Sequence, residues 1–407
     1  MSEGVAVPDG WKKTVLEQVA ENVSDKFQPN ETRSKKIKYV GLENLEPETF
    51  KVKTWGYSSD VVSAKNVFVE EDTLFGKLRP YLKKVSLADF KGICSTDILV
   101  IRPKQEISPF FLYRILSTDK IIAHSTESSA GNVMPRTSWK ELSGYVILVP
   151  PLLEQKKIAA ILTAVDEVIE KTAAQISKLQ DLKKGMMTEL LTKGIGHTEF
   201  KDSPVGRIPA AWELLTCGDV CRKIEVGIVV KPTKYYQDTG IPALRSANVR
   251  ENGLNKSNLK FISKKSNELL IKSKLDEGDV VTVRTGYPGT TAVVTKKFIG
   301  CNCVDLIISR PSHKVNSFFL SLWINSDFGK GQVLKNQGGL AQQHFNVGDM
   351  KKMLIAIPPM GEQNDIVKYH KAMTHRIACG INKLTQTKTL KKALMHDLLT
   401  GKKRVRV

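Results

Sequence analysis

Two stretches of the chain place apolar residues every three or four positions, one after Pro150-Pro151 and the other after Pro358-Pro359. A mean spacing of roughly 3.5 residues is typical of a coiled-coil seam rather than of the wider apolar stripe of a core helix. The pattern therefore predicts two long helices that pair antiparallel as a coiled coil. The positions expected to carry this pairing are Ile169, Ile176, Leu179, Met186, Ile377, Leu384, Leu390 and Leu394.

The remainder of the chain mixes short β-like runs with helical patches and Gly/Pro turns. The strand-like runs cover residues 96–101, 145–149, 280–283 and 354–357. Runs of this length between turn residues are typical of strands in mixed domains. The sequence therefore predicts an α+β protein in which two globular domains, at residues 1–150 and 197–358, are each followed by a long helix, at 151–196 and 359–407.

The two halves of the sequence repeat each other. Asp97 falls on Asp305 and Thr192 falls on Thr400, both at an offset of 208 positions. The offset stays constant over this region, whereas the register drifts upstream of it. An ordered series of such matches indicates a tandem duplication. We therefore expect two similar domains separated by the two helices, related by a pseudo-two-fold internal repeat.

The net charge of the chain indicates which class of partner it binds. The chain of 407 residues has 62 Lys and Arg against 42 Asp and Glu, a formal net charge of +20. Such a surplus favours a polyanionic partner, because each neutralised phosphate releases condensed counterions. Nucleic acid is therefore the favoured partner, although a solvated basic surface would have the same composition.

Composition also limits the class of protein. Hydrophobic residues make up 41% and charged residues 26% of the chain, which is ordinary for a globular protein and excludes disorder as its main state. No apolar run reaches the roughly 20 residues that span a bilayer, and the N-terminal residues lack the pattern of a signal peptide. Six cysteines are few for a disulfide scaffold of this length. We therefore expect a cytoplasmic protein with no membrane partner.

Several motifs taken together resemble one known family. A Pro-Pro pair opens the run PPLLEQKKI at 150–158, and the helix that follows ends in TELLT at 188–192. The second half begins with IPAAWEL at 208–214, and FGKLRPYL at 75–82 lies within the first domain. In this duplicated order the chain resembles, over essentially its full length, the specificity subunit of a Type I restriction–modification system.

The resemblance implies a function for each part of the chain. Residues 1–150 and 197–358 would be target-recognition domains, each reading one half of a bipartite, asymmetric site on double-stranded DNA. The helices at 151–196 and 359–407, the latter with a basic tail, would act as a spacer and dock two methyltransferase subunits. Two motor-nuclease subunits would complete the complex. S-adenosylmethionine, Mg²⁺ and ATP would bind to those partners, with no cofactor on this chain, in the cytoplasm of a prokaryote.

A self-contained DNA methyltransferase or nuclease with unrecognised motifs is the main alternative. Amino methylation needs a polar residue before a Pro-Pro-aromatic motif, but Val149 and Ile357 precede the two Pro-Pro pairs. A Walker loop and the paired spacing of a zinc site are also missing. Asp97 and Asp305 begin strands, which favours a turn or capping role, and His370 is expected on a solvated helix face. We therefore predict a non-catalytic chain with no metal-binding residue; a coiled-coil scaffold with incidental charge is a third alternative.

Three kinds of segment are candidates for DNA contact, because Arg and Lys pair with guanine or phosphate, Tyr stacks, and Asn and Gln suit adenine. The first kind follows a predicted strand and comprises Lys77, Arg79, Tyr81, Lys83, Arg284 and Tyr287. The second precedes the last strand of each domain and comprises Asn132, Arg136, Gln342, Gln343 and His344. The third lies earlier in each domain and comprises Arg33, Lys36, Lys38, Lys234, Arg245, Asn248 and Arg250. For each residue taken alone, a solvated surface role is the alternative.

Overall fold

The computed structural model describes residues 7–29, 36–127, 135–335 and 344–406. The chain forms two compact units, each with its own core. Unit 1 comprises residues 1–175 and 380–407, and unit 2 comprises residues 176–379. Each unit therefore contains the first part of one long helix and the last part of the other.

Unit 1 is built on two sheets and one terminal strand pair. The first sheet has the order β2 (Ala20–Val23), β10 (Ile98–Pro103), β7 (Thr73–Gly76) and β8 (Val85–Leu87). The second has the order β3 (Lys26–Phe27), β6 (Lys65–Phe68), β9 (Gly92–Cys94), β4 (Lys38–Val40) and β5 (Gly56–Tyr57). The pair is β1 (Lys12–Val15) with β11 (Val146–Val149). All neighbours are antiparallel except β4 and β9.

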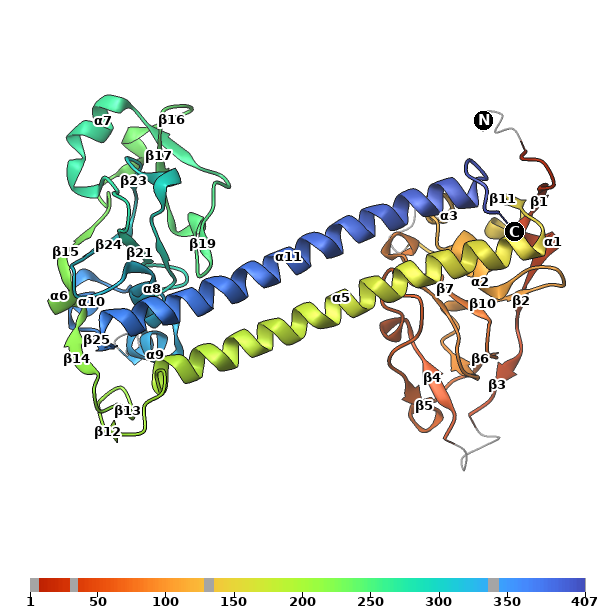
Figure 1. Ribbon diagram of the computed structural model, residues 1–407. Coiled ribbons are helices and arrows are strands. Elements are labelled where there is room, and N and C mark those ends of the chain that lie inside the picture. The colour runs from red at the N-terminus through yellow and green to blue at the C-terminus, as the bar shows by residue number, and fades with distance from the viewer. Residues whose placement is uncertain (1–6, 30–35, 128–134, 336–343, 407) are drawn as a thin grey trace. The chain divides into compact units, whose positions relative to one another are not determined.

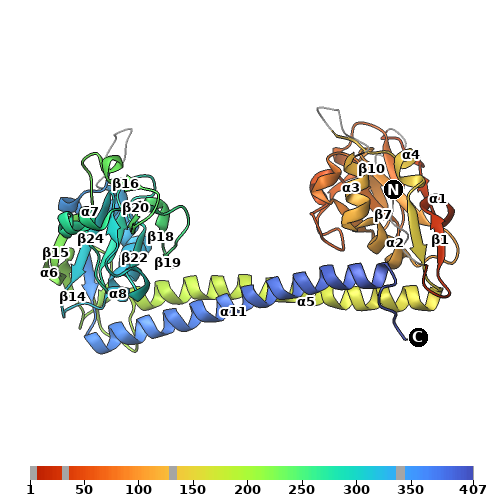
Figure 2. The ribbon, with the colours of Figure 1, turned by 90° about the horizontal axis from the view of Figure 1, so that it is seen from above.

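Four short helices cover the first sheet of unit 1. They are α1 (Leu16–Val19), α2 (Pro109–Leu116), α3 (Asp119–Glu127) and α4 (Trp139–Ser143). Both views show α2 between the β7–β10 sheet and the long helix α5 (Leu152–Thr192) (Figures 1 and 2). Phe111, Leu112 and Leu116 of α2 are buried in the core, which gives this helix its inward position. Helix α2 therefore connects the sheet to α5.

Unit 2 repeats the sheet of unit 1 and adds smaller pairs. The repeated sheet has the order β15 (Cys221–Val226), β24 (Leu306–Pro311), β21 (Val280–Val283) and β22 (Thr291–Val293). A second sheet has the order β16 (Tyr236–Gln237), β20 (Lys260–Ile262), β17 (Ile241–Leu244) and β23 (Asn302–Cys303). The pairs are β14 (Glu213–Thr216) with β25 (Leu354–Ile357), β12 (Phe200–Lys201) with β13 (Ile208–Pro209), and β18 (Val249–Arg250) with β19 (Gly253–Leu254).

The helices of unit 2 also follow the order of unit 1. The α-helices are α6 (Cys217–Val220), α7 (Lys264–Leu269), α8 (Ser317–Asn325), α9 (Asp327–Lys335), α10 (Val347–Lys352) and the long α11 (Met360–Leu399). The short 3-10 helices of the two units are Leu42–Asn44, Ser58–Asp60, Pro80–Leu82, Pro232–Tyr235, Ser246–Asn248, Ile271–Ser273 and Lys296–Phe298. Both four-stranded sheets place the equivalent strands in the same order, and in both units the strand just before the first short α-helix pairs with the last strand. The predicted α+β fold and internal repeat are therefore confirmed.

The predicted strands agree with the structure most closely in the second half. Strands β21 and β25 have the predicted limits, whereas β10 begins at Ile98 and continues to Pro103. The Ile98 N–H donates to the carbonyl of Ser95 at 3.0 Å, which makes a turn of the residues just before the strand. A hydrogen-bonded turn of this kind is not visible in the hydrophobic pattern, so the prediction began the strand too early.

The two long helices are antiparallel within each unit. In unit 1, Glu154 of α5 bonds Arg404 just beyond the end of α11, and Asp166 further along α5 bonds Lys391. In unit 2, the backbone N–H of Ile195, just after α5, donates to Glu362 in the first turn of α11 at 2.8 Å. Residue numbers that rise along one helix therefore meet numbers that fall along the other.

Most of the residues predicted to form the seam are at least partly buried. Ile176 and Ile377 are each 8% exposed, and five others are half-buried: Ile169, Leu179, Met186, Leu384 and Leu394. Leu390 is 53% exposed, so its place in the seam was predicted wrongly. It lies six residues after Leu384, or about 240° around a helix, whereas Lys391 at seven residues returns to the inward face. The predicted apolar position is thus filled by a lysine.

The Glu-Gln pair after each Pro-Pro pair fixes the start of the helix to its globular domain. The Gln155 side-chain amide donates to the carbonyl of Pro150 at 2.9 Å, and its oxygen accepts the N–H of Ser108 at 2.9 Å. Gln363 makes the same two contacts at the equivalent residues, at 2.9 and 2.8 Å. Since the loop before α2 or α8 would otherwise leave a buried N–H without a partner, the glutamine satisfies a backbone group and anchors the helix.

The glutamate of each pair accepts a hydrogen bond from a buried tryptophan. The indole N–H of Trp11 donates to Glu154 at 3.1 Å, and that of Trp212 donates to Glu362 at 3.1 Å. Arg404 adds two bonds to Glu154, at 2.8 and 2.9 Å. The first residues of each domain are thereby attached to the first turn of the helix that follows it.

A buried charged cluster joins α2, α5 and α11 in unit 1. Arg114 of α2 is fully buried and bonds Asp166 through Nη1, while its Nη2 donates to Thr163 at 3.0 Å. Lys391 of α11 contacts the same Asp166 carboxylate at 2.7 Å. The guanidinium also lies 4.7 Å from the ring centre of Phe50. One carboxylate therefore balances two cations from two different helices.

Replacing this carboxylate should destabilise unit 1. Asp166→Ala leaves Arg114 buried without its ion pair, so the free energy of unfolding should fall by about 3–5 kcal/mol. The neighbouring Glu167→Ala is the matched control, because Glu167 is exposed and forms an ion pair with Lys171, which is exposed too. That control should change the value by about 0.5 kcal/mol or less. Urea titration followed by circular dichroism measures both, and equal effects of the two variants would contradict the role of the cluster.

A histidine occupies the helix seam of unit 2, which corrects the prediction that His370 lies on a solvated face. Its side chain is half-buried. Burial lowers the pKa of His370 to about 4, and the positive charges of Lys183 and Lys371 act in the same direction. The error arose because the many charged residues of this helix do not show on which of its faces a single histidine lies. At neutral pH His370 is therefore uncharged in the seam.

This depressed pKa makes unit 2 sensitive to acid. An unfolded histidine binds a proton below its ordinary pKa of 6.5, whereas folded His370 resists protonation down to about pH 4. The unfolded chain therefore binds more protons between these values, and the folded state loses stability as the pH falls through that range. His370→Gln should reduce the drop in melting temperature between pH 7 and pH 5. His375→Gln, at an exposed position of the same helix, should leave the drop unchanged; a smaller drop in that variant as well would contradict the assignment.

Candidate nucleic-acid interface

In unit 1 the first and second candidate segments lie side by side. The carbonyl of Lys77, just after β7, accepts the N–H of Thr137 at 3.0 Å, and the Arg79 N–H donates to the carbonyl of Pro135 at 2.8 Å. The Lys77 N–H also donates to the carbonyl of Asp97 at 2.8 Å. The backbone thus joins three loops, which lie after β7, before β10 and before α4.

The Asp97 side chain orders the basic group at this junction. Its carboxylate accepts a hydrogen bond from Nη2 of Arg136 at 2.6 Å, and the Arg136 side chain is 57% exposed. Arg79 and Tyr81 are also exposed on the adjacent loop. Lys77 is held differently, since its Nζ donates to the carbonyl of Thr96 at 2.7 Å. Burial lowers the pKa of Lys77, and the charge of Asp97 partly offsets this effect.

Unit 2 repeats this junction with different side chains. The Phe345 N–H donates to the carbonyl of Arg284 at 3.1 Å, and Nη1 of Arg284 donates to the Asp305 carboxylate at 2.6 Å. The Thr285 hydroxyl contacts Asp305 at 3.3 Å and Nδ1 of His344 at 3.0 Å. Asp305 therefore connects the loop after β21 with the segment before α10.

The exposed group in this loop of unit 2 is a tyrosine. Tyr287 is 83% exposed, whereas the side chain of Arg284 is 19% exposed. Arg284 also donates from Nε to the carbonyl of Phe345 at 3.3 Å, so two of its nitrogens serve the fold. Gly286 has a φ of +90°, which places the turn in a region that side chains rarely adopt. The loop thus exposes the Tyr287 side chain, whereas the Arg284 side chain is mostly buried and bonded within the unit.

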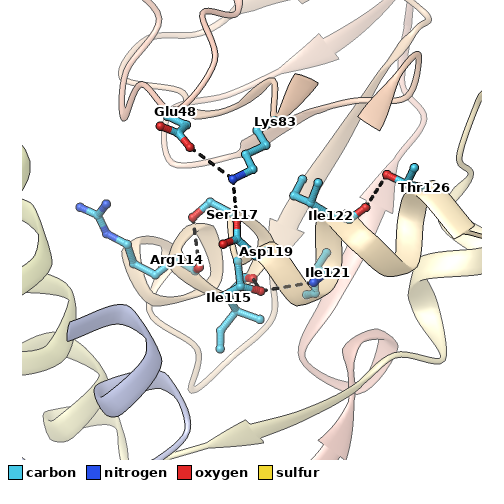
Figure 3. A network of polar contacts seen from close by, with 10 residues as sticks. Glu48, Lys83, Arg114, Ile115, Ser117, Asp119, Ile121, Ile122 and Thr126 are labelled. Atoms are coloured by element: carbon cyan, nitrogen blue, oxygen red, sulfur yellow. Dashed lines mark hydrogen bonds and ion pairs between the residues drawn. The ribbon is translucent and has the colours of Figure 1, made fainter. Parts of the chain in front are cut away.

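Lys83 is committed to contacts inside unit 1. Its Nζ lies 2.5 Å from Asp119 and 3.3 Å from Glu48. Figure 3 shows Lys83 between these two carboxylates. The hydrogen bond to Asp119 raises the pKa of Lys83 and lowers that of Asp119. With two carboxylates beside it, this lysine positions the 3-10 turn Pro80–Leu82 against α3. Lys83 therefore has a structural role, and its contact with DNA stays a prediction.

The third segment of unit 1 combines lysines with aromatic rings. Lys38 lies over Trp55 at 3.8 Å and over Phe90 at 4.2 Å, while Lys36 lies 5.8 Å from the ring centre of Tyr57. Trp55 and Tyr57 are 37% and 42% exposed on the edge of the five-stranded sheet. Such cation–π contacts hold the ammonium groups at the surface without neutralising them.

The third segment of unit 2 is partly structural. Asn248 is fully buried: its oxygen accepts the Arg245 N–H at 3.0 Å and its amide donates to the carbonyl of Ser257 at 2.8 Å. Its predicted role in base reading is therefore wrong, because both its side-chain oxygen and its side-chain amide are bonded within a buried turn. The Arg245 side chain donates to the carbonyl of Asn258 at 2.9 Å. Arg250 and Lys234 are exposed.

Sequence reasoning missed several residues of this interface. The carboxylates of Asp97 and Asp305 position basic groups, although their equivalence in the repeat was visible. Trp55 and Tyr57 were also overlooked; their alternation with Lys51 and Lys53 was the available signal. Four predicted residues lie outside the described part of the chain and their contribution stays a prediction: Arg33, Asn132, Gln342 and Gln343.

Within the described ranges, no three His, Cys, Asp or Glu side chains gather as metal ligands would. Over those same ranges, no helix is both long and apolar enough to span a membrane. Burial raises the pKa of the Cys94 thiol to about 12, which leaves it protonated at neutral pH.

Two α+β units with matching loop junctions, joined to long antiparallel helices, define a class of duplicated recognition proteins. The family model described as "Type I restriction modification DNA specificity domain" matches residues 8–181 and 209–389. The chain belongs to this family. Its function is that of a specificity subunit in a type I restriction–modification system, which confirms the resemblance noted in the sequence.

Individual relatives show the same organisation over nearly the whole chain. The chain is 28% identical over 427 residues to a protein of Methanocaldococcus jannaschii assigned as the MjaX type I restriction enzyme specificity subunit, covering 98% of this chain and 95% of that one. It is 28% identical to the MjaVIII specificity subunit of the same organism, covering 78% and 75%. Among solved structures, a chain of a type I R-M system has a TM-score of 0.64 at 21% identity, covering 97% and 98%. The S subunit from M. genitalium has a TM-score of 0.56 at 12% identity, covering 98% of both chains, and these two structures share the fold.

Proposed function

We propose that each unit reads one half of a bipartite, asymmetric site on double-stranded DNA. The observation that carries this proposal is the repeated loop junction. One backbone contact recurs, from the Thr137 N–H to the carbonyl of Lys77 in unit 1 and from the Phe345 N–H to the carbonyl of Arg284 in unit 2. The exposed groups differ, with Arg136 and Tyr81 in unit 1 and His344 and Tyr287 in unit 2. Equivalent loops with different side chains suit two readers of different sequences.

Charge supports DNA as the ligand. The net charge of +20 favours phosphate binding, and Arg79 and Arg136 are exposed basic residues at the loop junction of unit 1. Arg250 is an exposed basic residue elsewhere in unit 2. Phosphate contacts position a protein on the duplex, and contacts to base edges supply the specificity. The aromatic–lysine group at Lys36 and Lys38 is assigned to phosphate contact in this scheme.

The chain is proposed to act without chemistry of its own. In this scheme two methyltransferase subunits dock along α5 and α11, two motor-nuclease subunits join them, and S-adenosylmethionine, Mg²⁺ and ATP bind to these partners in the cytoplasm. The non-polar residues before the Pro-Pro pairs and the structural use of the Glu-Gln motif support this division of labour. The Glu-Gln pair that follows each Pro-Pro pair serves to anchor the helix.

The long helices are proposed to space the two readers. Helix α5 has 41 residues and α11 has 40, so each extends about 60 Å at about 1.5 Å per residue. A reader at each end of a stiff rod would fix the separation of the two half-sites as a geometric property.

Exchanging one domain should change one half-site. Residues 12–149 would be replaced by the equivalent part of a related specificity subunit, with Trp11, Arg114 and Glu154 kept so that the anchoring contacts survive. The complex with methyltransferase subunits should then methylate sites in which only one half has changed, as mapped by long-read sequencing. Exchange of 213–357 should change the other half.

The controls separate recognition from catalysis. The purified chain without methyltransferase subunits should methylate and cleave no DNA in the presence of S-adenosylmethionine and Mg²⁺. A single exchange that altered both halves, or methylation by the chain alone, would contradict the proposed function.

A further inference from the structure

Arg136 and His344 occupy the same position in the two repeats, at the 208-residue offset that relates Asp97 to Asp305. Each precedes the residue whose N–H closes the loop junction, Thr137 in one unit and Phe345 in the other. Both are exposed, and both connect to the aspartate of their own unit. The connection is direct for Arg136 and passes through the Thr285 hydroxyl for His344.

We propose that the position shared by Arg136 and His344 determines one base pair of each half-site, and that Asp97 and Asp305 are positioning residues for it. This inference rests on the proposed function, because it names the residues through which each unit would read its half-site. For unit 1 the expected base is guanine. For unit 2 the position should read a different base pair, since a histidine replaces the arginine.

The chemistry of the arginine favours guanine in unit 1. A guanidinium presents a planar fork of donors that matches the N7 and O6 acceptors of guanine in the major groove. One nitrogen of Arg136 is held by Asp97 at 2.6 Å, which fixes the plane of the group, and 57% exposure leaves the side chain accessible. Holding the fork in advance reduces the rotamer entropy lost on binding. The carboxylate therefore serves orientation rather than contact with DNA.

The neighbouring residues are used in other ways, which singles out this position. Arg284 spends Nη1 and Nε on Asp305 and on the carbonyl of Phe345, and Lys83 is paired with two carboxylates. His344 uses Nδ1 for Thr285, which leaves Nε2 for a base edge. In both units the exposed group next to the aspartate is thus the residue before the junction N–H.

The test uses the full chain in complex with its methyltransferase subunits, and the readout is the methylation rate on DNA sites that differ at one base pair. Arg136→Ala should lower the preference for guanine at one position of one half-site by roughly 5-fold to 150-fold. Arg136→Lys should lose most of the same preference although it keeps the charge, because an ammonium lacks the fork. Asp97→Asn should broaden the same position and no other.

A matched control removes a different Arg–Asp pair of unit 1. Arg102 bonds Asp72 at 2.7 and 2.8 Å, away from the loop junction, so Asp72→Asn should lower the melting temperature without changing base preference. In unit 2, His344→Arg should change one base pair of the other half-site, and the unit 1 half-site should stay as it was. A purely structural role would change the melting temperature and leave the base preference unchanged, so the two measurements together distinguish the roles.

Three results would overturn the inference. They are an Arg136→Lys variant with full guanine preference, an Arg136→Ala variant that loses affinity equally for all sequences, and an Asp97→Asn variant whose base preference is unchanged. The first would show that the guanidinium fork is not what selects guanine, and the second would assign Arg136 to phosphate contact. Failure of the proposed function is distinguishable, because the unmodified complex would then show no bipartite methylated site at all.

Discussion

The antiparallel pairing of α5 and α11 is the constraint on which the rest of the structure depends. Because each helix starts in one unit and ends in the other, each unit brings the start of one long helix into contact with the segment just after the end of the other. In unit 1 this is Arg404 on the Glu154–Trp11 pair, and in unit 2 it is Ile195 on Glu362. The apolar seam supplies contact area, and the polar contacts fix which residues meet.

Buried polar contacts give the pairing its register. An apolar seam alone tolerates a shift by one heptad, since leucine and isoleucine pack in many combinations. Asp166, bonded by Arg114 and Lys391, tolerates no such shift, because a displaced helix would leave a buried charge unpaired. At the 208-residue offset, Lys183 in unit 2 is the equivalent of Lys391 in unit 1. Lys183 lies near His370 and not near an equivalent of Asp166, so the polar contacts of the helix pair differ between the two units.

The sequence allowed the scaffold to be predicted and the interface only in part. The apolar spacing revealed both helices, and the matches at a constant offset revealed the repeat. Each of these signals comes from many residues, so one misread position does not change the prediction. Single residues fared worse: Leu390 and Asn248 were misplaced, since a phase error of one residue and a buried turn leave no local pattern. Arg136 was found because its basic character and loop position agree with its exposed place in the structure. The aspartates that position such groups require knowledge of which loops meet.

Lengthening both helices together tests the central claim most directly. Seven residues inserted after Gln175 in α5 and seven after Cys379 in α11 keep the apolar seam in phase and extend each helix by about 10.5 Å, or about three base pairs. Long-read sequencing of DNA methylated by the complex should then show both half-sites unchanged and a spacer about three base pairs longer. An unchanged spacer at full activity, or a change in either half-site, would contradict the account.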